Sequence, residues 1–199
     1  TETYEDLDGI VDLAYSVLNA NREVNDGKLS PRFNVTVSTS VFVPKPNTPF
    51  QWFSQDSQET MKDKQQYLKA KLRHKNISYD YHDYDLSFLE AVIARGDRRL
   101  SAAIHSAFRK GCKFDSWGEH FRYDLWMEAF EENGIDPFEI ANGEWKIDQP
   151  LPWDHIDTGV SKAFLVREWN EALEENTTGD CRENCLGCSI NTDIGKGLC

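Results

Sequence analysis

Three cysteines near the C-terminus have the spacing of ligands for a metal ion or an iron–sulfur cluster. Cys181, Cys185 and Cys188 form a C-x3-C-x2-C run. Thiolates from such a short loop hold iron–sulfur clusters, and three of them leave one iron of a cubane open to another ligand. Zinc would need a fourth ligand to close its tetrahedral shell. The candidates for that ligand are Cys199, Asp180 and, less directly, His155. The spacing alone does not decide between an iron–sulfur cluster and a zinc ion. The alternative to both is three free thiols.

Two neighbouring pairs of His and Asp are weaker candidates for acid–base chemistry. His82 and Asp83 follow a short predicted strand, and a carboxylate beside an imidazole can fix its tautomer for proton transfer. Asp154 and His155 lie in an aromatic segment and could supply ligands or an acid–base group. The alternatives are a plain turn for the first pair and capping of the following helix for the second. The residues leave both questions open.

A strand with one polar face is a candidate cofactor-binding surface. In the segment 33–43, apolar and polar side chains alternate with a period of two. The polar face consists of Asn34, Thr36, Ser38 and Ser40. In an open or partial barrel such a face can point into a lumen that holds a cofactor, whereas an edge strand would simply be wet on this side.

The loop after this strand contains a candidate binding residue, Lys45. Three prolines fall within the six residues 44–49, which excludes regular structure there. Barrels built from βα units place their chemistry at the C-terminal ends of the strands, where this loop lies. Lys45 could therefore meet a cofactor carboxylate or a substrate, and a solvated loop lysine is the alternative.

The elements that must position these residues alternate between helix and strand at the front and are helical afterwards. The sequence predicts helix 4–20, strand 33–43, helix 57–74, strand 77–81, helices from 87 to 110, a helix through 130 and a last helix over 161–173. The order helix–strand–helix–strand is typical of βα units in a parallel sheet. The fold class expected is therefore α/β.

Capping boxes and a hydrophobic stripe refine the helical half. Ser87-Phe-Leu-Glu90 and Ser116-Trp-Gly-Glu119 each match the pattern that opens a helix. The second would begin a helix that Pro137 helps to close. Its expected buried stripe consists of Trp117, Phe121, Leu125 and Trp126.

Composition limits the function classes. The chain has 199 residues, a formal charge of −12 and a high aromatic content of 12%. Such an acidic chain is a poor general binder of nucleic acids or anionic membranes, although a local basic patch could still bind RNA. One basic spot, Arg95 with Arg98 and Arg99, could bind a phosphate or carboxylate, or form ion pairs.

No apolar run approaches the roughly 20 residues that span a bilayer. A clustered, odd set of five cysteines indicates metal ligation in a reducing compartment, so a cytoplasmic location is expected.

A series of motifs, in order, is similar to one enzyme family. Thr1-Glu2-Thr3-Tyr-Glu-Asp resembles the end of a signature that follows the fourth barrel strand of radical S-adenosylmethionine enzymes, and 42–52 resembles the loop after their fifth. The further matching segments are 87–90, 95–99, 114–117, 151–157 and 181–188. Together they resemble a sparsely characterised bacterial subgroup, described as Fe–S oxidoreductases, in which a cobalamin-binding-like domain precedes the barrel. The resemblance covers nearly the whole chain.

The resemblance implies that the chain is the C-terminal part of a radical S-adenosylmethionine enzyme. Residues 1–86 would be the last βα units of a partial barrel, 87–176 a mainly helical extension and 177–199 a C-terminal cysteine loop. In the family, a [4Fe–4S] cluster cleaves S-adenosylmethionine reductively, and the 5′-deoxyadenosyl radical abstracts a hydrogen atom. The resemblance also implies that the polar strand face contacts S-adenosylmethionine.

The cysteine run departs from the family's cluster motif. That motif follows the first barrel strand, far upstream, and usually has an aromatic residue at its penultimate position, where this chain has Gly187. Here a helix and Thr177-Thr178-Gly179 precede the cysteines. They are therefore expected to hold an auxiliary cluster or zinc. Cys112, beside Gly111, is expected to be a packed thiol.

The expected partner is the upstream part of the same polypeptide. The chain begins at Thr1 with no Met, and we expect it to be cut from a longer protein and inactive alone. The alternative is a self-standing zinc- or cluster-stabilised binding module without catalysis. RNA, peptide and small molecule all stay open as substrates, cobalamin stays open as a further cofactor, and no membrane partner is expected.

Overall fold

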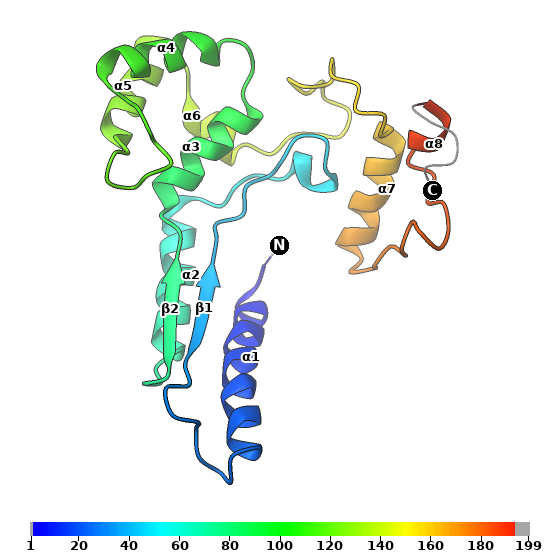
Figure 1. The fold of residues 1–199 in the computed structure, drawn as a ribbon. Coiled ribbons are helices and arrows are strands. Elements are labelled where there is room, and N and C mark those ends of the chain that lie inside the picture. Colours follow the sequence, from blue (N-terminus) through cyan, green and yellow to red (C-terminus); the bar gives the residue numbers. More distant parts are fainter. Residues whose placement is uncertain (1, 194–199) are drawn as a thin grey trace. The chain divides into compact units, whose positions relative to one another are not determined.

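The computed structural model describes residues 2–193, with the side chains of 192 and 193 excepted. The chain divides into two compact units (Figure 1). The first unit comprises Thr1–Phe42 and Asp56–Ser87, and the second comprises Val43–Gln55 and Phe88–Cys199. The proline loop after the first strand thus belongs to the second unit.

The first unit is a small α/β structure. Its elements are α1 (Tyr4–Glu23), β1 (Val35–Thr39), α2 (Gln58–Lys71) and β2 (Ile77–Tyr81). The two strands pair in parallel, from Val35 opposite Ile77 to Thr39 opposite Tyr81. Parallel pairing requires a crossover connection, and α2 supplies it. In the part of the chain that the structure describes, the fold is therefore α/β, mostly helical, with a two-stranded parallel sheet.

Local signals in the sequence account for both helices of this unit. Thr3 and Asp6 form a capping box at the start of α1, and the Ser57 hydroxyl accepts a hydrogen bond from the Thr60 N–H at the start of α2. Apolar residues recur in α1 at helical spacing on its buried face. Those residues are Leu7, Val11, Ala14 and Leu18.

Both helices cover the same face of the sheet (Figure 1). Leu7 and Val11 of α1 form one core with Leu68 of α2. The strand residues that pack against this core are Val35, Val37, Ile77 and Tyr79. The predicted alternation in β1 is confirmed, although the strand is shorter than the segment 33–43. The predicted strand 77–81 agrees with β2.

The second unit is helical in its described part. Its elements are η1 (Pro49–Trp52), most of α3 (Tyr84–Arg95), α4 (Leu100–Lys110), α5 (Tyr123–Glu132), α6 (Pro137–Asn142), α7 (Lys162–Leu173) and α8 (Ile190–Asp193). One of its cores joins Trp52 of η1 to Leu165 of α7, with Leu151 and Trp153 from the aromatic segment before α7. The segment 143–161 between α6 and α7 has no helix or strand and includes turns.

Two predicted helix starts are wrong. Ser87 lies inside α3, which begins three residues earlier because the Asp83 carboxylate accepts a hydrogen bond from the Asp85 N–H. The segment 116–119 forms a turn, and α5 begins only at Tyr123. A capping-box pattern describes a local option, and the neighbouring contacts decide whether the chain uses it.

The end of α5 and its expected stripe also differ from the sequence prediction. Pro137 is the first residue of α6, a position at which the backbone N–H that proline lacks would have no partner in the helix. Asp136, just before it, accepts hydrogen bonds from the N–H groups of Phe138 and Glu139. Trp126 is buried as expected, whereas the Trp117 side chain is 61% exposed. Helical spacing does not apply to Trp117, because it precedes the helix.

None of the helices within residues 2–193 has both the length and the hydrophobicity to cross a bilayer.

Candidate functional site

The polar face of the sheet is formed by side chains of both paired strands. Thr36 lies opposite Ser78 and Ser38 lies opposite Asp80 in the strand register. The Thr36 and Ser78 hydroxyls are hydrogen-bonded at 3.2 Å. All four of these side chains are exposed, on the side of the sheet away from α1 and α2.

The other residues predicted on this face extend it at both ends. Asn34 is exposed, and its side-chain oxygen accepts a hydrogen bond from Asn76 Nδ2 at 3.3 Å. Ser40 is exposed just beyond the end of β1. The structure thus places all four predicted residues on one side of the chain, and that side is open.

Sequence reasoning missed Ser78 and Asp80 as members of this face. The alternation of Ile77, Tyr79 and Tyr81 with Ser78 and Asp80 carries the same period-two signal as the first strand. Only the parallel pairing shows that the polar side of the second strand continues that of the first.

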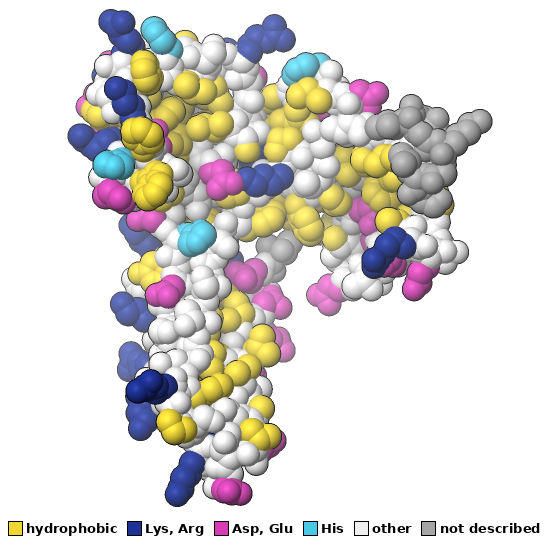
Figure 2. All heavy atoms as spheres, in the orientation of Figure 1, with side chains coloured by type: hydrophobic (Ala, Val, Ile, Leu, Met, Phe, Trp, Pro, Cys, Tyr) yellow, Lys and Arg dark blue, Asp and Glu magenta, His cyan; other side chains and the backbone are white. Residues whose placement is uncertain are grey.

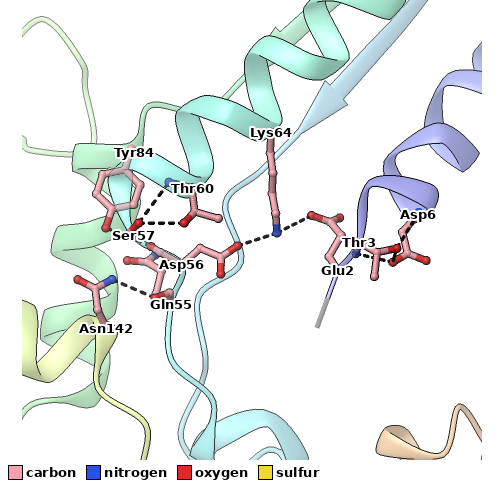
Figure 3. A network of polar contacts seen from close by, with 10 residues as sticks. All are labelled: Glu2, Thr3, Asp6, Gln55, Asp56, Ser57, Thr60, Lys64, Tyr84 and Asn142. Carbon is pink, nitrogen blue, oxygen red and sulfur yellow. Dashed lines mark hydrogen bonds and ion pairs between the residues drawn. The ribbon is translucent and has the colours of Figure 1, made fainter.

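A second polar group in this unit centres on Lys64 of α2 (Figure 3). The Lys64 ammonium forms ion pairs with Asp56 at 2.7 Å and with Glu2 at 3.1 Å. Burial alone would lower the pKa of Lys64, but the hydrogen bonds with Asp56 and Glu2 outweigh it and raise that pKa. Asp56 precedes α2 and Glu2 precedes α1, so one lysine ties the starts of both helices together.

The other strand-end candidates, His82 and Asp83, do not form a His–Asp pair. The His82 N–H donates to the Thr39 carbonyl at 3.1 Å, which continues the ladder by one bond. The Asp83 carboxylate accepts from the Asp85 N–H at 2.8 Å and so caps α3. The His82 side chain is exposed.

Lys45 belongs to the second unit and forms an ion pair with Glu90 of α3. Both side chains are about half exposed, at 48% and 56%. An exposed pair of this kind contributes little to stability, and the lysine could exchange its partner for a ligand. The structure therefore gives Lys45 a carboxylate partner within its own unit.

Asp154 and His155 lie in the aromatic segment before α7. The Asp154 carboxylate accepts a hydrogen bond from the Leu151 N–H at 2.9 Å, which closes a turn. His155 is exposed. Asp154 thus has a local structural role, and no hydrogen bond or ion pair joins these two side chains in the part of the chain that the structure describes.

The cysteine loop is anchored to the start of α7. The Ser161 N–H donates to the Cys188 carbonyl at 2.9 Å, and Arg167 Nη2 donates to the Leu186 carbonyl at 2.7 Å. Cys181 and Cys185 are exposed, and Cys188 is partly buried. Asn191 Nδ2 lies 3.5 Å from Cys185 Sγ.

The three thiols of this loop form no disulfide with a described residue, and they do not converge. Among the residues that the structure describes, no three His, Cys, Asp or Glu side chains are grouped so that they could hold a metal ion. Cys199, a proposed fourth ligand, lies outside the described residues. Cys112 is buried, as expected of a packed thiol, and burial raises the pKa of this thiol.

The three arginines of the basic spot separate in the structure. Arg95 is fully buried and donates to the carbonyls of Ala141 and Gly143, each at 2.7 Å. Arg99 pairs with Asp97 at 2.9 Å. Arg98 is exposed, with no ion pair among the described residues. They do not form one anion-binding group.

The chain is similar to an archaeal protein. It is 23% identical over 135 residues to the uncharacterized protein MJ0966 of Methanocaldococcus jannaschii. The matched segment is 68% of this chain and 28% of the archaeal protein, so the chain spans little more than a quarter of that relative. No family model matches the chain, and neither does a solved structure.

Proposed function

We propose that this chain is part of a radical S-adenosylmethionine enzyme and forms the last βα units of its partial barrel, followed by a helical extension. The observation that carries the proposal is the first unit's sheet. Its helices cover one face, and the opposite face is a row of small polar side chains. A sheet between two helical layers would be apolar on both faces. Polar residues opposite the helices suit a strand whose inner side faces a cofactor-filled lumen.

The residues on the polar face fit S-adenosylmethionine chemically. Thr36, Ser38 and Ser78 offer hydroxyl donors and acceptors for the polar groups of the cofactor. Asp80 offers a carboxylate, which complements the positive charges of the sulfonium and ammonium groups. No bulky side chain stands among these residues on the two strands.

The cofactor supplies the reactive species, a carbon radical formed by reductive cleavage of its sulfonium bond. The residues of this chain would hydrogen-bond the cofactor, orient it and form one wall that excludes water. The primary [4Fe–4S] cluster would be held by cysteines upstream in the same polypeptide. The low coverage of the archaeal relative, 28%, is consistent with a longer protein. Cobalamin, substrate identity and a cytoplasmic location stay predictions.

The polar face gives the sharpest test of the enzyme proposal. The reading frame upstream of Thr1 should encode a C-x3-C-x2-C run after a strand. In the protein that contains it, Ser38→Leu should lower reductant-dependent formation of 5′-deoxyadenosine by at least about tenfold, because it removes a hydrogen bond and adds bulk. Iron content should stay unchanged.

Asn19→Leu is the matched control, since Asn19 is exposed on α1, away from the sheet face. An open reading frame that starts at Thr1, or a Ser38→Leu protein as active as the control, would contradict the proposal.

A second candidate function is a non-catalytic binding module stabilised by zinc or by a cluster at Cys181, Cys185 and Cys188. It is favoured by the anchoring of the loop at both Leu186 and Cys188, which would let a bound metal fasten the loop to α7. The described thiols would have to move together to share one metal. Metal binding often orders such a loop, because a preformed site is not required.

Metal content separates the two forms of the cysteine site. The chain should be purified without oxygen and assayed for iron, sulfide and zinc, with a UV–visible spectrum. Iron with sulfide, lost in Cys185→Ser and kept in the control Cys112→Ala, would support an auxiliary cluster. Zinc with the same dependence would support a structural clip. If the purified chain contains neither iron nor zinc, this result would contradict metal ligation by this loop alone.

A further inference from the structure

The outer surface of α4 and the loop after it combines exposed aromatic rings with cations. We define the α4 surface by Phe108, Arg109, Lys113, Phe114 and Trp117. The three rings are 57%, 72% and 61% exposed in sequence order. Figure 2 shows dark blue and cyan side chains among yellow ones in the part of the molecule where Figure 1 draws α4 and α5.

This surface is basic within an acidic chain. Between residues 98 and 122 there are six Lys or Arg and two Asp or Glu, whereas the whole chain has 22 and 34. Helix α4 contains no acidic residue at all. Arg98 is exposed near its start, and Arg109 is exposed near its end. Neither forms an ion pair with a described residue, so their charge is available to an anion.

The buried residues of α4 recur at helical spacing on one face, and the α4 surface lies on another face. Leu100, Ala103 and Ala107 are buried, which turns Phe108 and Arg109 outward. Lys113 lies above the Phe108 ring, with its ammonium 5.4 Å from the ring centre. Lys113 and the Phe108 ring are therefore neighbours on this surface.

In the loop after α4, Asp115 is bonded to α5, whereas Phe114, Trp117 and the second acidic residue, Glu119, are exposed. Cys112 is buried, and the Asp115 carboxylate accepts a hydrogen bond from Trp126 Nε1 of α5 at 3.2 Å. Between them Phe114 has a φ of 59°, an unusual value for a phenylalanine. Positive φ at a bulky residue costs free energy, and such strain gathers at functional positions.

We propose that the α4 surface binds a single-stranded nucleic acid. Base stacking on exposed aromatic rings, with cations beside them for the phosphates, is the way proteins bind single strands. Arg109 and Lys113 of this surface, together with the exposed Arg98 just before α4, would contact phosphates. The rings of Phe108, Phe114 and Trp117 would stack on bases. This inference does not depend on the proposed enzymatic function.

Charge and ring exposure together favour this ligand over other polyanions. A phosphate-rich ligand without bases would use the cations and leave the rings exposed to water. A duplex hides the faces of its bases, so it could not stack on the rings. A single strand offers both phosphates and open base faces, and it matches the whole surface.

The test is fluorescence anisotropy of a labelled single-stranded RNA, about 12 nucleotides long, titrated with the 199-residue chain at low salt. Trp117→Ala and Phe108→Ala should each weaken binding about tenfold, the effect expected for one lost base stack. Binding should weaken with salt, with a log–log slope of roughly −2 for three phosphate contacts on a single strand.

A charge-reversal pair supplies the matched control. Arg109→Glu with Lys113→Glu should abolish binding, whereas Lys62→Glu with Lys69→Glu makes the same change in net charge on exposed positions of α2 and should not. All four positions are exposed, so the variants should fold, and far-UV circular dichroism checks this. Single-stranded DNA should bind comparably, because stacking and phosphate contacts do not require a 2′-hydroxyl.

Several results would overturn the proposal. These are no binding at low salt, equal losses in the two charge-reversal pairs, or equally tight binding of a duplex of the same sequence. Tight binding of heparin with no effect of Trp117→Ala would show a general anion-binding surface. Tight binding of an acidic peptide in place of RNA would show a protein-docking surface.

Discussion

At the residue scale, buried and paired charges here have structural partners. Arg95 donates to two carbonyls at the C-terminal end of α6, where the helix dipole favours a cation. Burial lowers the pKa of Arg95 to about 10, which still leaves it protonated at neutral pH. The three arginines that are close in sequence therefore have different roles. Arg95 binds the end of α6, Arg99 forms an ion pair and Arg98 is exposed.

Asp8 allows a test of how much one paired carboxylate charge contributes to the stability of the folded chain. Hydrogen bonds from Lys71 and then Tyr67 hold the pKa of Asp8 below its usual value of 3.8. A lowered folded-state pKa adds stability above the unfolded pKa and loses it as pH falls through the folded pKa. Asp8→Asn should therefore lower the urea midpoint at pH 7, and the difference from the unmodified chain should close as pH falls below about 3.8.

The control for this experiment is Asp12→Asn on the same helix. The Asp12 carboxylate is exposed and has no hydrogen-bond partner among the described residues. It should leave the urea midpoint nearly unchanged at both pH values. A gap for Asp8→Asn that stays constant from pH 7 to pH 2 would show that the carboxylate charge is not its cause.

At the element scale, the first unit depends on two helices that cover one face of a two-stranded sheet. Leu68 of α2 and Leu7 of α1 meet in the core below the strands. A two-stranded sheet is marginal in water without such cover. The helices therefore stabilise the sheet and leave its polar face free.

Leu68→Ala tests this dependence. The Leu68 side chain is 3% exposed, so its truncation should cost about 2–4 kcal/mol in free energy of unfolding. Leu13→Ala on α1 is the matched control, because Leu13 is 66% exposed and should change that free energy by less than about 0.5 kcal/mol. Urea unfolding followed by far-UV circular dichroism measures both. Equal effects would mean that α2 does not cover the sheet as described.

At the scale of the whole molecule, the chain forms two compact units that differ in their tryptophan content. Each of the six tryptophans falls in the second unit. They are Trp52, Trp117, Trp126, Trp145, Trp153 and Trp169. Tryptophan fluorescence thus reports on the second unit alone.

This distribution allows the units to be followed separately. Leu165→Ala, in the core with Trp52 and Trp153, should move the urea midpoint seen by tryptophan fluorescence, because it opens a cavity in the second unit. Leu68→Ala should leave that fluorescence midpoint in place while it shifts the signal from circular dichroism. If both variants shift both signals equally, the two units unfold as one.

The sequence by itself determined most helices, the strand at 77–81 and the two-faced character of the first strand. These features depend on period and on caps, which neighbouring residues along the chain set between them. The negative net charge and the cysteine spacing can likewise be read directly from the sequence. The hypothesis of a metal or cluster at Cys181, Cys185 and Cys188 stays a prediction.

Only the tertiary structure decided which polar residues share a face, where α3 begins and how Trp117 lies. Ser78 and Asp80 join the first strand's polar residues through the parallel register, which connects positions about 40 residues apart. The Asp115–Trp126 hydrogen bond holds the loop in which Trp117 points outward. Pairings between distant segments compete with local preferences, and their contribution to the free energy appears only once the chain is folded.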